Sequence, residues 1–501
     1  MLKPTPMLMP AGAYRRAEQI ASGGGARRPL PPLGGPDRLS FPRPVQRRLD
    51  NGLRVVAVPS PGAATVEVRV QIPYVASGAR DTALAELLAA VAFAGTARLG
   101  DRDVAWDAAL ATGRLQTRRT MEWLILAGHC AAPELPELLG LLGGRLRHPH
   151  YQEDRIRQEA ERIAHAVAIL RAQPRRTALR ELNHARYGQL GCFEELPPGD
   201  MVRALSARAV HEAHERMLVP DQADVLIVGD IEGEAAADAV AQAFAAWHGP
   251  THGPRAARTP AVAAPSDAAH HPRRLVARQG AVQAHMAMSL PAVGPEDPRY
   301  PAQAVANAVL AGYFSSRLVS NVREREGLTY HAQSRFDRTL GAMSIVVEAV
   351  CATAATERVV EEILAETRRM VTEPPSEREI DDARRFLSGS LLMATASALD
   401  LANLLSSLSC WGMDLGWIES CPGALLDVTR SDVADVAGEI FGPGPSSGAV
   451  VGDAVALSGP LARFGYTPLA SEGFSGSGLP GNGLPGSRLP GNGLPSNGAE
   501  R

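Results

Sequence analysis

Two kinds of hydrophobic spacing alternate along the chain and predict its elements. Residues 66–72, VEVRVQI, alternate aliphatic and polar side chains, which predicts a half-buried strand. Residues 83–96, ALAELLAAVAFAGT, are a run of strong helix formers ending near Gly95, which predicts a helix. An Asp-Asn-Gly turn at residues 50–52 precedes the aliphatic run LRVVAV, so we expect a hairpin there. The first part of the chain therefore mixes strands and helices.

The same order of elements recurs later in the chain. A predicted strand at 283–293 takes the place of 66–72, and a predicted helix at 300–312 takes the place of 83–95. Residues 373–392 repeat the layout of residues 148–167, a proline break followed by a charged helix. We therefore predict an α+β fold of two tandem homologous domains, each an antiparallel sheet with helices packed on it.

Composition divides the chain into five segments. Residues 1–42 are rich in Pro, Gly and Arg and are predicted to be disordered. The first domain is predicted at 43–248 and the second at 273–466, joined by a Pro/Ala/His-rich linker at 249–272. Residues 467–501 end in a five-residue Gly-x-x-Leu-Pro repeat, which we expect to be disordered. Both a tethering role and a neutral tail remain open for that repeat.

Charge and cysteine content narrow the function classes. The 501 residues are 45% hydrophobic and 21% charged with a net charge of −3, so no nucleic-acid or anionic-membrane partner is indicated. The five cysteines form no C-x-x-C pair, which argues against a disulfide framework or zinc knuckle and fits a reducing compartment. With no apolar leader or long apolar run, the expected location is the cytoplasm, with no membrane partner.

The helix at 83–96 resembles the metal-binding helix of the pitrilysin/insulinase family of zinc peptidases, whose motif is H-x-x-E-H. The three motif positions here hold Glu86, Ala89 and Ala90, so the general base and the second histidine are missing. The family's remaining ligand falls on Ala166, although a glutamate seven positions earlier, Glu159, is retained. A catalytic zinc site needs three protein ligands. We therefore expect no catalytic residue and no metal in this chain.

Two histidine-rich segments are weaker candidates for a metal site. The HPH sequence at 148–150 is interpreted as a capping or solvated loop. The HEAHE sequence at 211–215 has its second histidine at i+3, one residue short of the zinc-peptidase spacing, and is interpreted as a surface helix.

The second half carries a segment for which the resemblance implies a function. Residues 314–330, FSSRLVSNVREREGLTY, are similar to the family's S-S-R-L…R-E-x-x-G-L-x-Y segment. Arg323 and Tyr330 correspond to the pair that, in the family, binds the substrate backbone across the chamber from zinc. From the residues alone, a different interpretation is open, in which Arg323 caps a helix and the Tyr330 hydroxyl is hydrogen-bonded internally.

The resemblance implies a clamp subunit like those of the mitochondrial processing peptidases. In two-chain members one subunit holds zinc and the other supplies the Arg/Tyr pair. We expect this chain to be the zinc-free subunit of such a heterodimeric metalloendopeptidase, inactive alone and active with a zinc-bearing homologous partner on unfolded peptides. The alternative is a structural or peptide-binding protein without a proteolytic role. The family's substrate-pairing edge strand falls near residues 115–117, where Gln116 retains an amide.

Overall fold

The computed structural model describes residues 41–74, 76, 78–91, 115–149, 151–187, 196–249, 273–339 and 341–469. Most of the linker and nearly all of the tail lie outside these residues. Strand β12 runs to Leu469, three residues past the boundary at which we predicted the tail to begin.

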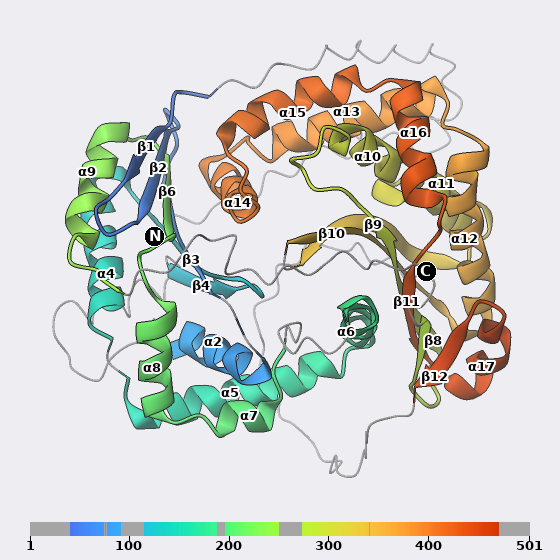
Figure 1. The fold of residues 1–501 in the computed structure, drawn as a ribbon, viewed down its shortest axis with the longest axis horizontal. Helices are drawn as coiled ribbons and strands as arrows, with labels where there is room; N and C mark the ends of the chain where they lie inside the picture. Colours follow the sequence, from blue (N-terminus) through green and yellow to red (C-terminus); the bar gives the residue numbers. More distant parts are fainter. Residues whose placement is uncertain are drawn as a thin grey trace, which may run out of the picture. The chain divides into compact units, whose positions relative to one another are not determined.

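The first half of the chain is built on a six-stranded sheet with helices packed against it (Figure 1). The strands lie in the order β1 (Val45–Arg48), β2 (Arg54–Pro59), β6 (Asp224–Gly229), β3 (Val66–Pro73), β5 (Trp123–Cys130) and β4 (Leu115–Arg119). The helices of this half are α2 (Ala79–Val91), α4 (Leu135–Arg147), α5 (Glu153–Arg171), α6 (Pro174–Tyr187), α7 (Gly199–Arg203), α8 (Ala207–Met217) and α9 (Gly233–Phe244), with the short turn η1 (Ala132–Glu134).

The second half repeats this plan on another six-stranded sheet. Its strands lie in the order β12 (Tyr466–Leu469), β7 (Arg273–Ala277), β11 (Ser447–Gly452), β8 (Gln283–Pro291), β10 (Ala342–Ala352) and β9 (Thr329–Thr339). Its helices are α10 (Tyr300–Asn307), η4 (Ala308–Gly312), α11 (Arg317–Val319), η5 (Ser320–Arg325), η6 (Thr353–Ala355), α12 (Thr356–Thr372), α13 (Glu377–Met393), α14 (Ala398–Ser409), α15 (Leu415–Asp427), α16 (Arg430–Phe441) and α17 (Ala454–Ala462).

The two sheets share a topology that differs in one respect from the prediction. Both were expected to be antiparallel, but both are mixed: β2 pairs in parallel with β6, and β7 pairs in parallel with β11 and β12. The reason is that β6 and β11 follow long helical crossovers and insert beside the first long strand of their sheet, running in its direction. All other pairings are antiparallel, and the α+β class and the tandem repeat are confirmed.

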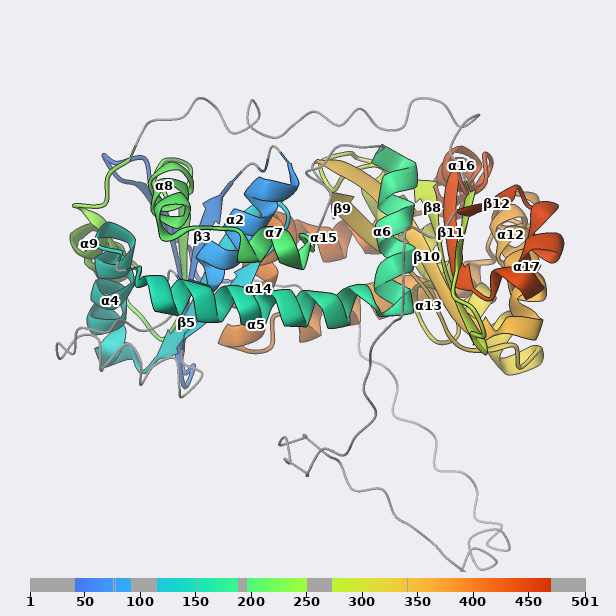
Figure 2. The ribbon, with the colours of Figure 1, turned by 90° about the horizontal axis from the view of Figure 1, so that it is seen from below.

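Each sheet has a helix from the other half of the chain packed on it. Helix α14 places Leu401, Ala402 and Leu405 against Val56 and Leu226 of the first sheet. Reciprocally, α6 places Ala178 and Leu182 against Ala287, Val346 and Ala449 of the second sheet. Figure 2 shows α6 standing against the strands of the second sheet. The two halves therefore share their apolar surfaces and complete one another.

This exchange of helices corrects the expectation for strand 66–72. The strand was predicted to be half-buried, yet both of its faces are buried. The polar face lies under α14, where the Arg69 guanidinium donates to Asn403 Oδ1 at 3.0 Å and the Gln71 amide donates to the Ser406 carbonyl at 2.8 Å. Burial lowers the pKa of Arg69 even though Glu67 pairs with it at 3.1 Å. The alternation of the sequence reflects a polar interface between the halves, not a face open to water.

Shortening one apolar side chain on the exchanged helix tests this packing. Leu401→Ala in α14 removes a side chain that is 3% exposed, so the free energy of unfolding should fall by about 2–5 kcal/mol. Leu399→Ala on the same helix, at a position that is 49% exposed, is the matched control and should change it by less than about 1 kcal/mol. Urea denaturation followed by circular dichroism measures both. Equal effects would show that α14 is not buried against the first sheet.

Candidate functional site

The helix that resembles the metal-binding helix is α2, and it packs against α5 as the resemblance requires. Ala89 is buried at 8% exposure, and Ala90 and Ala166 are half-buried. The retained Glu159 of α5 receives a hydrogen bond from Arg162 at 2.6 Å on its own helix. Alanine side chains offer a metal no donor atoms, and the one retained acid is engaged by an arginine. Among the described residues, no group of three or more His, Cys, Asp or Glu is placed to hold a metal ion.

Glu86, the remaining polar residue at the motif, is held by a buried arginine on the edge strand β4. Arg119 Nε donates to Glu86 Oε2 at 2.5 Å, and its NH1 donates to the Tyr74 hydroxyl at 2.9 Å. The Tyr74 hydroxyl in turn donates to the Thr120 carbonyl at 2.6 Å. Burial disfavours the Arg119 cation, but the interactions with Tyr74 and Glu86 outweigh it and raise its pKa. A fixed guanidinium cation therefore faces the only carboxylate of the motif, where an active enzyme would place its metal.

This ion pair was not predicted from the sequence. Arg119 lies 33 residues from Glu86, in a strand whose spacing carries no metal motif. The Arg118-Arg119 pair at the end of β4 marks a cationic strand end, but it does not identify Glu86 as a partner.

Neutralising Glu86 should show what the pair contributes. Glu86→Gln leaves the Arg119 side chain, which is 6% exposed, without its carboxylate, and should lower the free energy of unfolding by about 1–3 kcal/mol. Glu137→Gln, on the exposed side of α4, is the control and should change it by less than about 0.5 kcal/mol. Thermal or urea denaturation at neutral pH gives both values. A neutral result at both positions would mean that Glu86 is a spare surface carboxylate.

None of the described histidines of these two segments belongs to a group placed to hold a metal ion, but one of them is buried against expectation. His150 lies outside the described residues. Helix α8, expected on the surface, buries His214 at 5% exposure. Its Nε2 lies 2.9 Å from the Leu146 carbonyl and its Nδ1 lies 2.6 Å from the Tyr151 hydroxyl. Because a carbonyl only accepts, Nε2 carries the proton and Nδ1 accepts from Tyr151. Apolar contacts of α8 with α2 drive this burial, which a motif search does not register.

Protonation of His214 should destabilise the protein in mild acid. Burial lowers the pKa of His214 below its ordinary value of 6.5. The unfolded chain therefore takes up a proton that the folded chain resists, so the stability conferred by neutral His214 is lost as the pH falls below about 6.5. Each unit of displacement is worth about 1.4 kcal/mol. Urea denaturation between about pH 7.5 and 5 should show this loss in the wild type and a smaller one in His214→Gln. His165→Gln, at an exposed position of α5, should keep the wild-type slope.

The structure brings Arg323 and Tyr330 together. Arg323 belongs to η5 and Tyr330 to β9. The Arg323 guanidinium carbon lies 4.7 Å from the centre of the Tyr330 ring and 4.9 Å from the centre of the Phe314 ring. Phe314 and Tyr330 are 58% and 83% exposed, and no described residue accepts or donates a hydrogen bond at the Tyr330 hydroxyl. A cation stacked on two rings thus stands at the surface beside a phenol available to a ligand.

A β-bulge aims Tyr330 out of the sheet. Strand β9 pairs His331 with Val350 and Thr329 with Cys351, so Tyr330 is the extra residue between two ladder positions. The Thr329 hydroxyl closes the bulge by donating to the Val350 carbonyl and by accepting from the His331 backbone N–H at 3.0 Å. Bulges of this kind redirect a side chain and recur beside active sites. The exposure of Tyr330 therefore follows from the backbone and not only from its place at the strand end.

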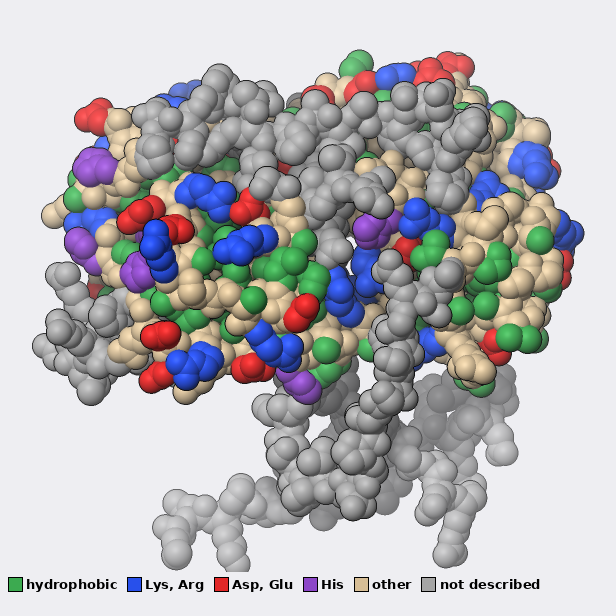
Figure 3. Space-filling model, turned by 60° about the horizontal axis from the view of Figure 1, so that its bottom comes forward, with side chains coloured by type: hydrophobic (Ala, Val, Ile, Leu, Met, Phe, Trp, Pro, Cys, Tyr) green, Lys and Arg blue, Asp and Glu red, His purple; other side chains and the backbone are tan. Residues whose placement is uncertain are grey.

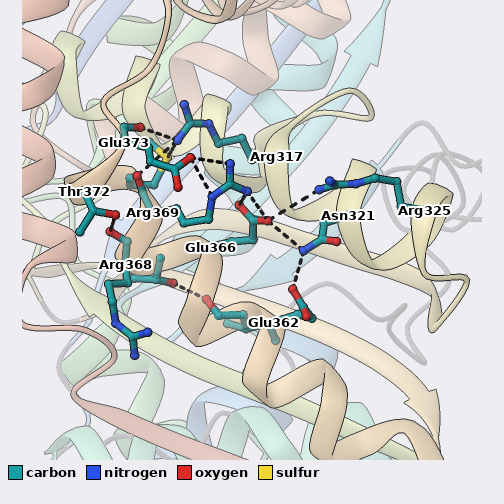
Figure 4. A network of polar contacts seen from close by, with 12 residues as sticks. Arg317, Asn321, Arg325, Glu362, Glu366, Arg368, Arg369, Thr372 and Glu373 are labelled. Atoms are coloured by element: carbon teal, nitrogen blue, oxygen red, sulfur yellow. Dashed lines mark hydrogen bonds and ion pairs between the residues drawn. The ribbon is translucent and has the colours of Figure 1, made fainter.

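A polar network holds η5, and so Arg323, against α12 (Figure 4). The Asn321 amide donates to Glu362 Oε2 at 2.5 Å and to Glu366 Oε1 at 2.8 Å. Arg369 donates to both Glu366 oxygens at 2.9 and 3.1 Å, and Arg325 approaches Glu366 at 3.9 Å. Glu366 is 1% exposed, so this carboxylate depends on its cationic neighbours. The helix that carries Arg323 is thereby anchored from its inner side.

Arg317 ties the start of the same segment to α13. Its guanidinium donates to Glu379 Oε1 at 2.6 Å and Oε2 at 3.0 Å, and to the Glu373 carbonyl at 2.8 Å. Glu379 also accepts from Ser376 as part of the capping box of α13. These bonds, that of Arg317 first, lower the pKa of Glu379 to about 2. The segment from Arg317 to Tyr330 is thus fixed at three places, by α13, by α12 and by the bulge.

Comparison with known proteins connects this geometry to a family. The family model described as "Peptidase M16 inactive domain" matches residues 204–387. A Streptomyces coelicolor protein described as an uncharacterized zinc protease is 24% identical over 413 residues, which cover 79% of this chain and 87% of that protein.

Solved structures agree on the fold. The structure of a peptidase M16 inactive domain from Pseudomonas fluorescens has a TM-score of 0.69 and 18% identity, covering 82% of this chain and 98% of that one. A protease from Helicobacter pylori has a TM-score of 0.69 and 17% identity, covering 82% and 99%. The resemblance to the pitrilysin/insulinase peptidases, the M16 group, is confirmed. Residues 204–387 match the inactive-domain model of that family, and the chain has the fold of these M16 peptidase-like structures.

Among the described residues, no single helix has the length and apolar character of a bilayer-spanning segment. Helices α13 and α14, which meet at a bend of 112°, together reach the length and apolar composition of a membrane span, by length and composition only.

Proposed function

We propose that this chain is the zinc-free subunit of a heterodimeric zinc metalloendopeptidase and supplies Arg323 and Tyr330 to its partner's active site. Zinc and the general base belong to a homologous partner subunit, and the substrates are unfolded peptides. The observation that carries the proposal is the exposed stack of the Arg323 guanidinium on the Tyr330 ring, at 4.7 Å, on a segment that the rest of the domain fixes in place.

The chemistry of the pair suits that role. Hydrolysis of a peptide bond places negative charge on the carbonyl oxygen, and a zinc ion held by the partner would activate the attacking water. A guanidinium and a phenol that both donate toward this oxygen stabilise the charge as it develops. Arg323 is oriented by two aromatic rings and by its 3.3 Å contact with Glu324, so little side-chain freedom is lost when substrate binds.

The state of the first half supports a division of labour. Arg119 forms an ion pair with the Glu86 carboxylate, and the side chains of Ala89, Ala90 and Ala166 have no donor atoms for a metal. The role of the first half is therefore structural. The exposed donors lie in the second half. A subunit organised in this way gains a catalytic role only next to a chain that holds the metal.

Complementation with a zinc-bearing homologue tests the proposal. The wild-type chain should confer cleavage of an unfolded peptide, and Arg323→Ala and Tyr330→Phe should each lower kcat/KM about tenfold to a hundredfold by removing one donor. Arg208→Ala removes an arginine of α8 that is 88% exposed and lies outside the Arg317–Tyr330 segment, and it is the control that should retain activity. Gel filtration confirms that each variant still assembles.

Two results would contradict the proposal. Wild-type turnover with both Arg323→Ala and Tyr330→Phe would exclude the donor role. Assembly without cleavage in every combination with a zinc-bearing homologue would instead favour a structural or peptide-binding protein that retains the fold.

A further inference from the structure

A cavity of about 620 Å³ lies between the two halves of the chain. Its walls come from the edge strand β4 and helix α6 of the first half and from the edge strand β9 and the end of α14 in the second half. Cavities of about 300–1,000 Å³ are the size that protein ligand sites use. The volume suits a few residues of an extended chain rather than a folded protein.

Arginine dominates the described lining. It includes seven arginines against two acidic residues, Glu122 and Asp337. The arginines are Arg118, Arg119, Arg175, Arg176, Arg186, Arg335 and Arg338. Three carboxylates outside the lining also form ion pairs with these arginines, those of Glu86, Glu348 and Glu296. Five acidic residues therefore stand against the seven arginines. The cavity is therefore cationic in a chain whose net charge is −3.

The outer surface looks different. On the face shown in Figure 3, basic and acidic side chains are intermixed over the described part of the molecule. A charge imbalance concentrated at an enclosed wall focuses the field there more strongly than the same imbalance spread over an open surface.

Buried ion pairs hold part of this wall in position. Arg186 is 5% exposed and donates to Asp337 at 2.9 Å, while its Nε is buried with no hydrogen-bond partner among the described residues. Arg335 also contacts Asp337, at 3.1 Å. Arg186 is therefore a fixed cation of the wall, held in place by Asp337.

The two edge strands add a second kind of recognition. Strands β4 and β9 each end their sheet, so no other strand among the described residues pairs with the outer side of either. Such an edge pairs with an extended peptide through main-chain hydrogen bonds. Here the edges lie beside cationic side chains, so main-chain pairing and charge would act on the same ligand.

We infer that this cavity binds extended peptide segments rich in Asp and Glu. The inference rests on the proposed function in that it names the substrate class, but it concerns the binding step that this chain performs by itself. Carboxylate side chains reach the arginines of the wall while the peptide backbone lies along a sheet edge.

Peptide binding to the isolated full-length chain tests the inference. The probes are a short fluorescein-labelled Ala/Ser peptide with several Glu residues and the same peptide with Gln or Lys in their place. Fluorescence anisotropy should show the Glu peptide binding at least about tenfold more tightly than either, with an affinity that falls as salt rises from about 0.05 to 0.3 M. Equal binding of the Gln or Lys peptide overturns the inference.

Matched variants separate the cavity from general charge. Arg118→Gln combined with Arg175→Gln removes two exposed cations of the lining and should weaken binding of the Glu peptide about tenfold. Arg157→Gln combined with Arg208→Gln removes two exposed arginines outside the lining and should leave it unchanged. Circular dichroism verifies that both pairs fold. If both weaken binding equally, or if inorganic phosphate displaces the peptide at the same concentration as free Glu peptide, no acidic-peptide site exists.

The assay is independent of complementation. It needs no partner and no zinc, so a negative binding result leaves the role of Arg323 and Tyr330 intact. A failed complementation likewise leaves the charge preference of the cavity standing.

Discussion

The reciprocal placement of α6 and α14 is the constraint on which the rest of the structure depends. Each helix leaves its own half and buries its apolar side on the other sheet. Because of this, the edge strands β4 and β9 come to line one cavity. The cationic wall of that cavity therefore depends on both halves of the chain.

The sequence predicted the repeated α+β plan and the pairing of Arg323 with Tyr330, because both depend on local spacing and on a recognisable segment. Contacts between distant residues could not be predicted in this way. The polar positions of strand 66–72 looked solvated, yet Arg69 meets Asn403, which lies 334 residues away. Alternation reports which side chains share a face, not what covers that face. Arg119 was missed for the same reason, since nothing near it in sequence marks Glu86 as its partner.

The motif helix of the first half differs from a metal-binding helix in its charge as well as in its ligands. A metal site concentrates positive charge against carboxylates. Arg119 now supplies a cation at Glu86 that needs no metal and remains charged at any physiological pH. Helix α2 packs against α5, and Arg119 balances the charge of its Glu86 carboxylate.

The bulge at Tyr330 makes function depend on chain length as well as on residue identity. Tyr330 points outward because β9 has one residue more than its partner strand at that place. Loss of one residue beside Tyr330, at the start of β9, would remove the bulge and turn the side chains that precede it to the other face of the sheet. An insertion or deletion there could therefore silence a descendant of this protein while Arg323 and Tyr330 both remained in its sequence, so alignments that score identity alone would overlook the change.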